Sequence, residues 1–187
     1  MNNEQFWKLL EPIHPELESF CRKLEGNRED GDDLYQEGLL IGIRKIDNLR
    51  DRKSFRPWLY RILINRYKNR RRGWWWKNTV GLIPSLAETS GYHDPQDRYD
   101  QKRLCMFLLS SLAAEERALV VLNKIEGWTY RELSELYKKP EGTIKARIHR
   151  ALKKMRRKLE CHLKKQEEKF STSEGFYALQ RSKTSDE

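Results

Sequence analysis

Five side chains between residues 145 and 153 have the types and spacing to bind nucleic acid. They stand at positions i, i+1, i+4, i+5 and i+8, so on a helix they share one exposed arc: Lys145, Ala146, His149, Arg150 and Lys153. Small, aromatic and cationic side chains in such an arc can contact base edges in a major groove. The alternative is an amphipathic helix whose basic face is merely solvated.

The other sides of this segment predict how it is held. Apolar residues recur at helical spacing and predict a stripe buried against preceding helices: Ile144, Ile148, Leu152, Met155 and Leu159. Three arginines flank the arc and suit phosphate contacts, which set register without reading sequence: Arg147, Arg156 and Arg157.

A turn and a second helix precede this segment. Thr129 and Glu132 fit a capping box, which predicts a helix beginning at Thr129. That helix meets Lys138, Lys139 and Pro140, and Pro is allowed as the first residue of a new helix. Two short helices joined by such a turn form a helix-turn-helix.

The whole chain reads as helical, because helical periodicity recurs almost everywhere and no segment alternates with period two. We therefore expect an all-α fold of two small helical domains, residues 1–72 and 100–165. Residues 73–99, rich in Gly and Pro, form the predicted linker. The tail, 166–187, is too polar to bury a core and is expected to be largely disordered.

Composition narrows the function. The 38 Lys and Arg against 28 Asp and Glu give a net charge of +10, which favours a polyanionic partner. Three scattered cysteines and four scattered histidines show no metal-ligand spacing, so we expect no metal site and no cofactor. No catalytic set appears, which argues against an enzyme. No basic leader or apolar run of roughly 20 residues is present, which predicts a cytoplasmic protein without membrane insertion.

The segment Leu112–Leu159 resembles region 4 of the sigma-70 family, in its extracytoplasmic-function group. The matching residues are Leu112, Glu115, Glu116, Arg117, Glu126, Gly127, Tyr130, Glu132, Pro140, Gly142, Thr143, Lys145 and Arg147. The resemblance implies that the arc faces the minus-thirty-five promoter element, with the contact set Thr143, Lys145, Ala146, Arg147, His149, Arg150 and Lys153. The family usually has Gly at the position of Lys138 and an apolar residue at that of Lys139, so a left-handed turn would be strained here.

The first domain is similar to region 2 of the same group. The matching residues are Asp33, Leu34, Gln36, Glu37, Phe55, Trp58, Leu59, Tyr60, Arg61, Ile62 and Asn65. The resemblance implies docking on core RNA polymerase by a face containing Asp32, Asp33, Gln36 and Glu37. Either Asp32 or Asp33 is expected to cap that helix. Gly38 and Gly42 inside it predict either a very close helix neighbour or a weak helix.

A further helix, from about Ser54 to Arg72, interleaves cations with aromatics, as suits a strand of unstacked bases. By resemblance, a pocket in the loop Asn48–Lys53, with help from Asn65, captures the melted minus-ten element. The predicted contact set is Asn48, Leu49, Arg50, Arg56, Tyr60, Arg61, Asn65 and Lys68. Trp58 is expected in the core, and Tyr60 is either a core aromatic or a nucleic-acid contact.

Two functional hypotheses follow. A sigma factor would bind core RNA polymerase and promoter DNA, as duplex and as melted strand, and such factors are commonly held inactive by an anti-sigma partner. The alternative is a stand-alone helix-turn-helix regulator that binds operator DNA, although it would not need the region 2 match. The consecutive indoles Trp74, Trp75 and Trp76 lie outside the family pattern and could pack against the first domain, stack on DNA or contact a regulator.

Overall fold

The computed structural model describes the backbone of residues 3–49, 51–78 and 96–183, and within these ranges all regular structure is helical. This confirms the all-α prediction. The α-helices are α1 (Asn3–Leu10), α2 (His14–Glu25), α3 (Arg28–Lys45), α4 (Phe55–Asn78), α5 (Gln96–Leu109), α6 (Ala114–Val120), α7 (Tyr130–Tyr137) and α8 (Glu141–Lys183). Short 3₁₀ turns span Glu11–Ile13, Ile46–Asn48 and Arg52–Ser54, and a π-helix, Val121–Ile125, extends α6.

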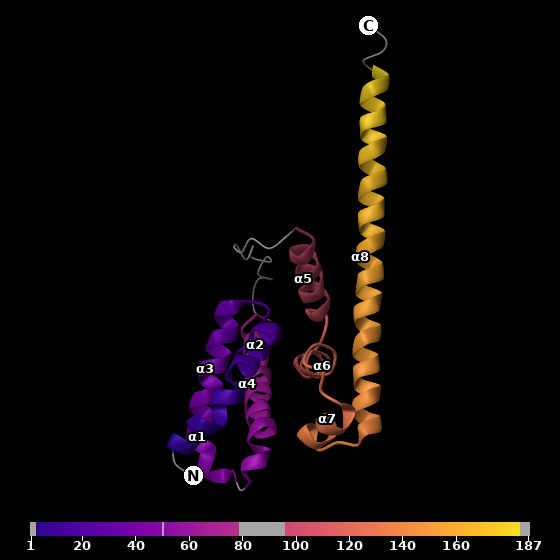
Figure 1. Cartoon of the computed structure of the whole chain (residues 1–187). Coiled ribbons are helices and arrows are strands. Elements are labelled where there is room, and N and C mark those ends of the chain that lie inside the picture. The colour runs from indigo at the N-terminus through magenta and orange to yellow at the C-terminus, as the bar shows by residue number, and fades with distance from the viewer. Residues whose placement is uncertain (1–2, 50, 79–95, 184–187) are drawn as a thin grey trace.

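Helices α1 to α4 form one bundle, and α5 to α8 lie beside it (Figure 1). The core of the first bundle is built from fully buried side chains on α2, α3 and α4, among them Leu17, Phe20, Leu34, Leu59 and Leu63. Apolar burial of this kind is the main favourable term in holding helices together.

Glycines let the bundle pack closely. A Cβ on Gly38 would lie 2.1 Å from Leu63 Cδ2, and one on Gly42 would lie 3.2 Å from Leu59 Cδ1. The two glycines inside α3 therefore mark a close approach of α4, which is the first of the two interpretations of this pair. Gly31 lies against backbone rather than a side chain, because its Cβ would lie 2.5 Å from the Cα of Arg22.

The start of α3 differs from the sequence prediction. Asn27 is the N-cap, and its side-chain oxygen accepts a hydrogen bond from the Asp30 amide at 2.8 Å. The prediction that Asp32 or Asp33 caps this helix is wrong, because the helix begins at Arg28, one turn earlier. An amide side chain satisfies the free N–H groups of a first turn as well as a carboxylate does.

The helix-turn-helix begins as the sequence predicts. Thr129 is the N-cap of α7, with Glu132 N donating to its Oγ1 at 3.2 Å. Thr129 N in turn donates to Glu132 Oε2 at 2.8 Å, which completes the capping box. Pro140 directly precedes α8, and its carbonyl accepts from the amides of Thr143 and Ile144.

The turn between α7 and α8 is left-handed at Lys138, with φ 50° and ψ 49°. Among the residues that the structure describes, Lys138 is the one non-glycine residue with a positive φ. The amide of Lys139 donates to Ser134 O at 3.1 Å, and Ser134 Oγ donates to Lys139 O at 2.6 Å. These bonds hold the turn although a side chain at Lys138 opposes the conformation.

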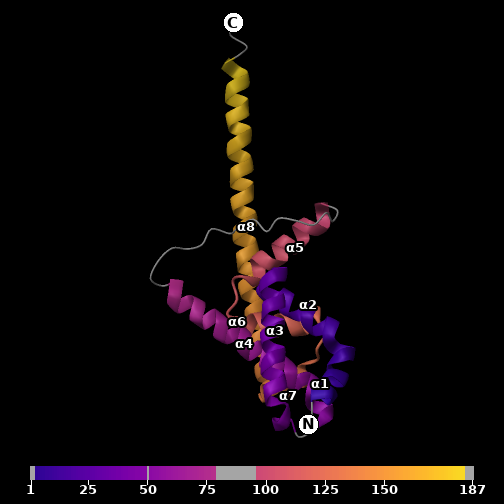
Figure 2. The same cartoon turned by 90° about the vertical axis from the view of Figure 1, so that its left-hand side faces the viewer.

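Two expected boundaries differ from the structure. Helix α4 continues to Asn78, so Trp74, Trp75 and Trp76 lie on its last turns, but their side chains, like most of the 73–99 linker, lie outside the described residues. Helix α8 continues to Lys183 rather than ending near residue 165, and it projects well beyond the other helices (Figures 1 and 2). Residues 166–183 lack proline, the residue that most strongly breaks a helix already begun.

The two halves touch through α2 and α4. Arg117 of α6, 3% exposed, donates from Nη2 to Lys23 O at the end of α2 at 3.1 Å. Trp128, 4% exposed, packs against Tyr60 of α4 with ring centroids 4.8 Å apart. Among the described residues, no helix is both long enough and apolar enough to cross a membrane.

Candidate nucleic-acid interface

The predicted arc on α8 is presented to the outside. Lys145, Ala146, His149, Arg150 and Lys153 are all exposed. Ile144, Ile148 and Ala151, on the opposite side of the helix, are at most 2% exposed. The apolar stripe therefore fixes the rotation of α8 and leaves a single outward face of small, aromatic and cationic groups.

Ion pairs anchor α8 to α6 on either flank of the stripe. Arg147 Nη1 lies 2.6 Å from Glu115 Oε1, and Lys154 Nζ lies 2.6 Å from Glu116 Oε1. Burial works to raise the pKa of Glu116, but hydrogen bonds from Lys154 and the Ala113 amide outweigh it and lower that pKa. Arg147 is thus engaged in positioning the helix, whereas Arg156 and Arg157 remain exposed along it.

The four residues of the predicted docking face on α3 fall into two pairs, one exposed and one hydrogen-bonded to arginines of the same bundle. Asp33 and Gln36 are exposed. Asp32 accepts from Arg22 Nε at 2.6 Å, and Glu37 accepts two hydrogen bonds from Arg66 at 2.7 and 2.8 Å.

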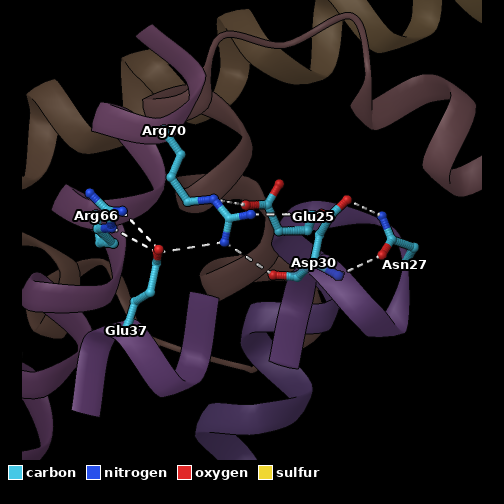
Figure 3. Close-up of polar contacts among 6 residues, drawn as sticks. All are labelled: Glu25, Asn27, Asp30, Glu37, Arg66 and Arg70. Atoms are coloured by element: carbon cyan, nitrogen blue, oxygen red, sulfur yellow. Dashed lines mark hydrogen bonds and ion pairs between the residues drawn. The ribbon is translucent and has the colours of Figure 1, made fainter. Parts of the chain in front are cut away.

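Glu37 belongs to a polar network inside the first bundle (Figure 3). Hydrogen bonds from Arg66 hold the pKa of Glu37 below its ordinary value. Arg70, on the next turn of α4, lies 3.6 Å from Glu37 Oε2 and 3.7 Å from Glu25 Oε1. Glu37 therefore ties α3 to α4, while Asp33 and Gln36 are the groups free to meet another protein.

At the start of α4, two polar side chains turn inward and share one carboxylate of α2. Tyr60, 0% exposed, donates from its hydroxyl to Glu16 Oε1 at 2.7 Å, and Arg56 pairs with the same carboxylate. Burial works to raise the pKa of Glu16, but the hydrogen bonds from Arg56 and Tyr60 prevail and lower it. The Arg56 guanidinium also lies 4.5 Å from the centroid of the Trp128 ring. Of the two interpretations of Tyr60, the burial of its ring supports a core aromatic. Trp58, which was expected in the core, is only half-buried.

Further along α4, the predicted strand-binding residues meet the second half of the chain. Arg61 donates from Nε to Leu136 O at 3.0 Å, and Lys68 Nζ lies 3.6 Å from Glu115 Oε2. Asn65 is exposed and lines a cavity of about 230 Å³ between α4 and α7. In the preceding loop Asn48 is exposed and Leu49 is half-buried, while Arg50 lies outside the described residues.

Two residues of this site were missed by sequence reasoning. Glu16 organises Arg56 and Tyr60 from 40 and 44 residues away, and no local pattern signals such a pairing. Trp128 follows Gly127 in a non-helical turn, where helical periodicity does not apply. Its backbone is fixed by a bond from its amide to Leu122 O at 2.9 Å.

Both halves of the chain match models of a single family. Sigma-70 region 2 matches residues 9–77, and sigma-70 region 4 matches residues 105–155. The chain belongs to the sigma-70 family. The first bundle is therefore its region 2, and the helix-turn-helix of α7 and α8 lies in its region 4.

The chain is similar to curated RNA polymerase sigma factors, several of which are named ECF factors. It is 34% identical over 147 residues to the ECF RNA polymerase sigma factor SigE of Mycolicibacterium smegmatis, covering 75% of this chain but only 56% of that relative. It is 29% identical over 142 residues to the RNA polymerase sigma-E factor of Streptomyces avermitilis, covering 75% and 76% of the two chains.

A solved structure has the same fold. It shows the sigma factor RpoE in complex with the anti-sigma factor NepR from Bartonella quintana, with a TM-score of 0.63 and 26% sequence identity. The match covers 84% of this sigma-70 family chain and 98% of the solved one.

Proposed function

We propose that this chain is a sigma factor of the extracytoplasmic-function type, which binds core RNA polymerase, recognises two promoter elements and initiates DNA-templated transcription. The observation that carries the proposal is the outward cationic arc of α8 in a chain that also contains region 2. A stand-alone operator binder would need the arc but not region 2.

In this proposal α8 reads the minus-thirty-five element. The exposed Lys145, Ala146, His149 and Arg150 contact base edges, and the cations that follow on the helix contact phosphates. Thr143 and Arg147, at the start of α8, complete the set, and Arg147 also keeps α8 on α6.

Region 2 supplies the other contacts. Asp33 and Gln36 form the exposed part of the polymerase-docking face, with Asp32 and Glu37 holding α3 in place behind them. The loop at Asn48–Lys53 and the cations of α4 bind the melted minus-ten strand. The protein supplies binding rather than catalysis, and it acts in the cytoplasm with the polymerase. By analogy with the Bartonella quintana factor, an anti-sigma protein is a further proposed partner.

The decisive experiment mixes the purified chain with sigma-free core polymerase and measures run-off transcripts from promoters of the source genome. We expect specific transcripts that depend on the chain. A chain that does not associate with core polymerase but binds duplex DNA would refute the sigma proposal and favour the operator binder.

The two roles proposed for α8 cations can be separated by a matched pair of substitutions. Arg150→Ala should reduce discrimination between promoter and random duplex, by about 1–3 kcal/mol if the side chain reads a base. Arg157→Ala removes the same charge about two turns further along α8 and should weaken binding to both duplexes equally while flattening the salt dependence. Binding isotherms over a salt series measure both quantities. Equal losses on both duplexes for both variants would contradict this division.

A further inference from the structure

The cavity of about 230 Å³ beside α4 is lined by three cations, Arg61 and Lys68 of α4 and Lys139 of the turn between α7 and α8. One carboxylate, that of Glu115, also lines it. This carboxylate is already paired, because its Oε1 lies 2.6 Å from Arg147 Nη1 and its Oε2 lies 3.6 Å from Lys68 Nζ. The cavity wall therefore carries more positive charge than the chain itself neutralises.

Two of these cations have no carboxylate partner among the described residues. Arg61 donates from Nε to Leu136 O and from Nη2 to Glu135 O, so its charge is hydrogen-bonded but not neutralised. Lys139 is half-buried, and its Nζ makes no hydrogen bond or ion pair with any residue that the structure describes. A partly desolvated ammonium without a partner costs free energy, and a bound anion would offset that cost.

Lys139 has no role in the DNA contacts proposed for the helix-turn-helix. It precedes the outward arc of α8, and it stands where the family usually has an apolar residue. Tyr137 lines the cavity as well, and its hydroxyl is buried without a hydrogen-bond partner among the described residues. The turn thus brings to the cavity a cation that its fold does not require, next to a second polar group that is left unsatisfied.

Apolar packing holds the walls of the cavity in place. Ile64 of α4 and Leu136 of α7 line it, and each is 3% exposed. Both belong to one buried apolar cluster that runs through the two halves of the chain. Cations that are fixed by such packing need little rearrangement to meet a ligand, and this preorganisation favours binding.

We propose that this cavity binds the oligophosphate group of a small molecule through Arg61, Lys68 and Lys139. Several cations around one cavity match a ligand with several negative charges, and the exposed Asn65 amide can donate a further hydrogen bond to a phosphate oxygen. A volume of about 230 Å³ is below the roughly 300–1,000 Å³ of pockets for drug-sized ligands. It suits pyrophosphate, or the phosphate end of a nucleotide whose base stays outside.

Calorimetric titration of the full chain in magnesium-free buffer tests the site with inorganic pyrophosphate, a nucleoside triphosphate and orthophosphate. We expect one saturable site for the first two ligands and weaker binding of orthophosphate, which carries less charge. Tighter binding of the triphosphate than of pyrophosphate supports a nucleotide ligand, and equal binding supports a free oligophosphate. A chain that binds neither oligophosphate at a saturable site overturns the proposal.

A matched pair of substitutions separates the site from general electrostatics. Lys139→Met restores the apolar character usual at this position and should weaken pyrophosphate binding about ten-fold or more, the loss expected for one charge-assisted hydrogen bond. Lys138→Met removes the same charge one residue earlier, from an exposed side chain outside the cavity lining, and should leave binding nearly unchanged. Lys139→Arg keeps the charge and should retain most of the binding. Equal losses for K138M and K139M would mean that net charge alone drives binding, and the proposal is then wrong.

The position of the ligand can be tested in the unaltered chain. Acetic anhydride acetylates accessible amines, and mass spectrometry of the digested protein measures the modification of each lysine. Bound pyrophosphate should protect Lys139 and leave Lys138 as reactive as before. Protection of both lysines to the same extent, or of neither, would refute the assigned site. Circular dichroism verifies the fold of each variant, and none of these assays uses polymerase or DNA, so their outcome is independent of the proposed sigma function.

Discussion

The left-handed residue in the helix-turn-helix gives the sharpest stability prediction. Lys138 has φ 50° and ψ 49°, a conformation that costs an L-residue roughly 1–2 kcal/mol. Its side chain is exposed, while its amide is bonded to Ser134 O, so Lys138→Gly removes the strain and keeps the backbone bond. The greater freedom of Gly in the unfolded chain offsets roughly 0.5–1 kcal/mol of this gain.

The expected net stabilisation is therefore about 0.5–1 kcal/mol. For a unit the size of this second half, that raises the melting temperature by about 2–8 °C. Thermal unfolding followed by far-ultraviolet circular dichroism measures it. Lys139→Gly is the matched control, since it removes the same charge one residue later, where φ is not positive, and it should destabilise. If K138G melts no higher than wild type, or falls as K139G does, the strain argument fails.

Two further predictions concern region 2. Gly31→Ala should lower the free energy of unfolding in urea by about 1–3 kcal/mol, because the new Cβ would lie 2.5 Å from the Arg22 backbone. Gly142→Ala is the control: its Cβ would have nothing within 4 Å, so the substitution should be neutral or slightly stabilising. Equal effects of the two substitutions would contradict the packing argument. Hydrogen bonds from Arg66 lower the pKa of Glu37 in the folded chain. The ionised Glu37 therefore contributes its full stabilisation above pH 4.5, the ordinary pKa of a glutamate, and this stabilisation is lost as the pH falls through the lowered pKa of the folded chain. Glu37→Gln should therefore be less stable than wild type at neutral pH and lose less stability on acidification, and parallel pH profiles would refute this.

Much of the architecture depends on residues close together in the chain and could be predicted from the sequence. The capping box at Thr129 involves residues three apart, and the buried stripe of α8 repeats every three or four residues. Patterns of this range are visible in sequence because helix geometry places such residues on one face. The glycine pair of α3 predicted either a close neighbour or a weak helix, and the position of Leu63 selected the first.

The sequence by itself determined the helices, the outward arc of α8 and the two-part division of the chain. Tertiary structure alone decided which charged groups remain available. Glu37 is tied to Arg66, 29 residues away, and Arg61 is bound to Leu136, 75 residues away. No periodicity encodes such pairs, because they depend on how separate helices pack after each has formed. The same packing buried Tyr60 beneath Trp128 and brought region 4 onto the helix proposed to hold the melted strand.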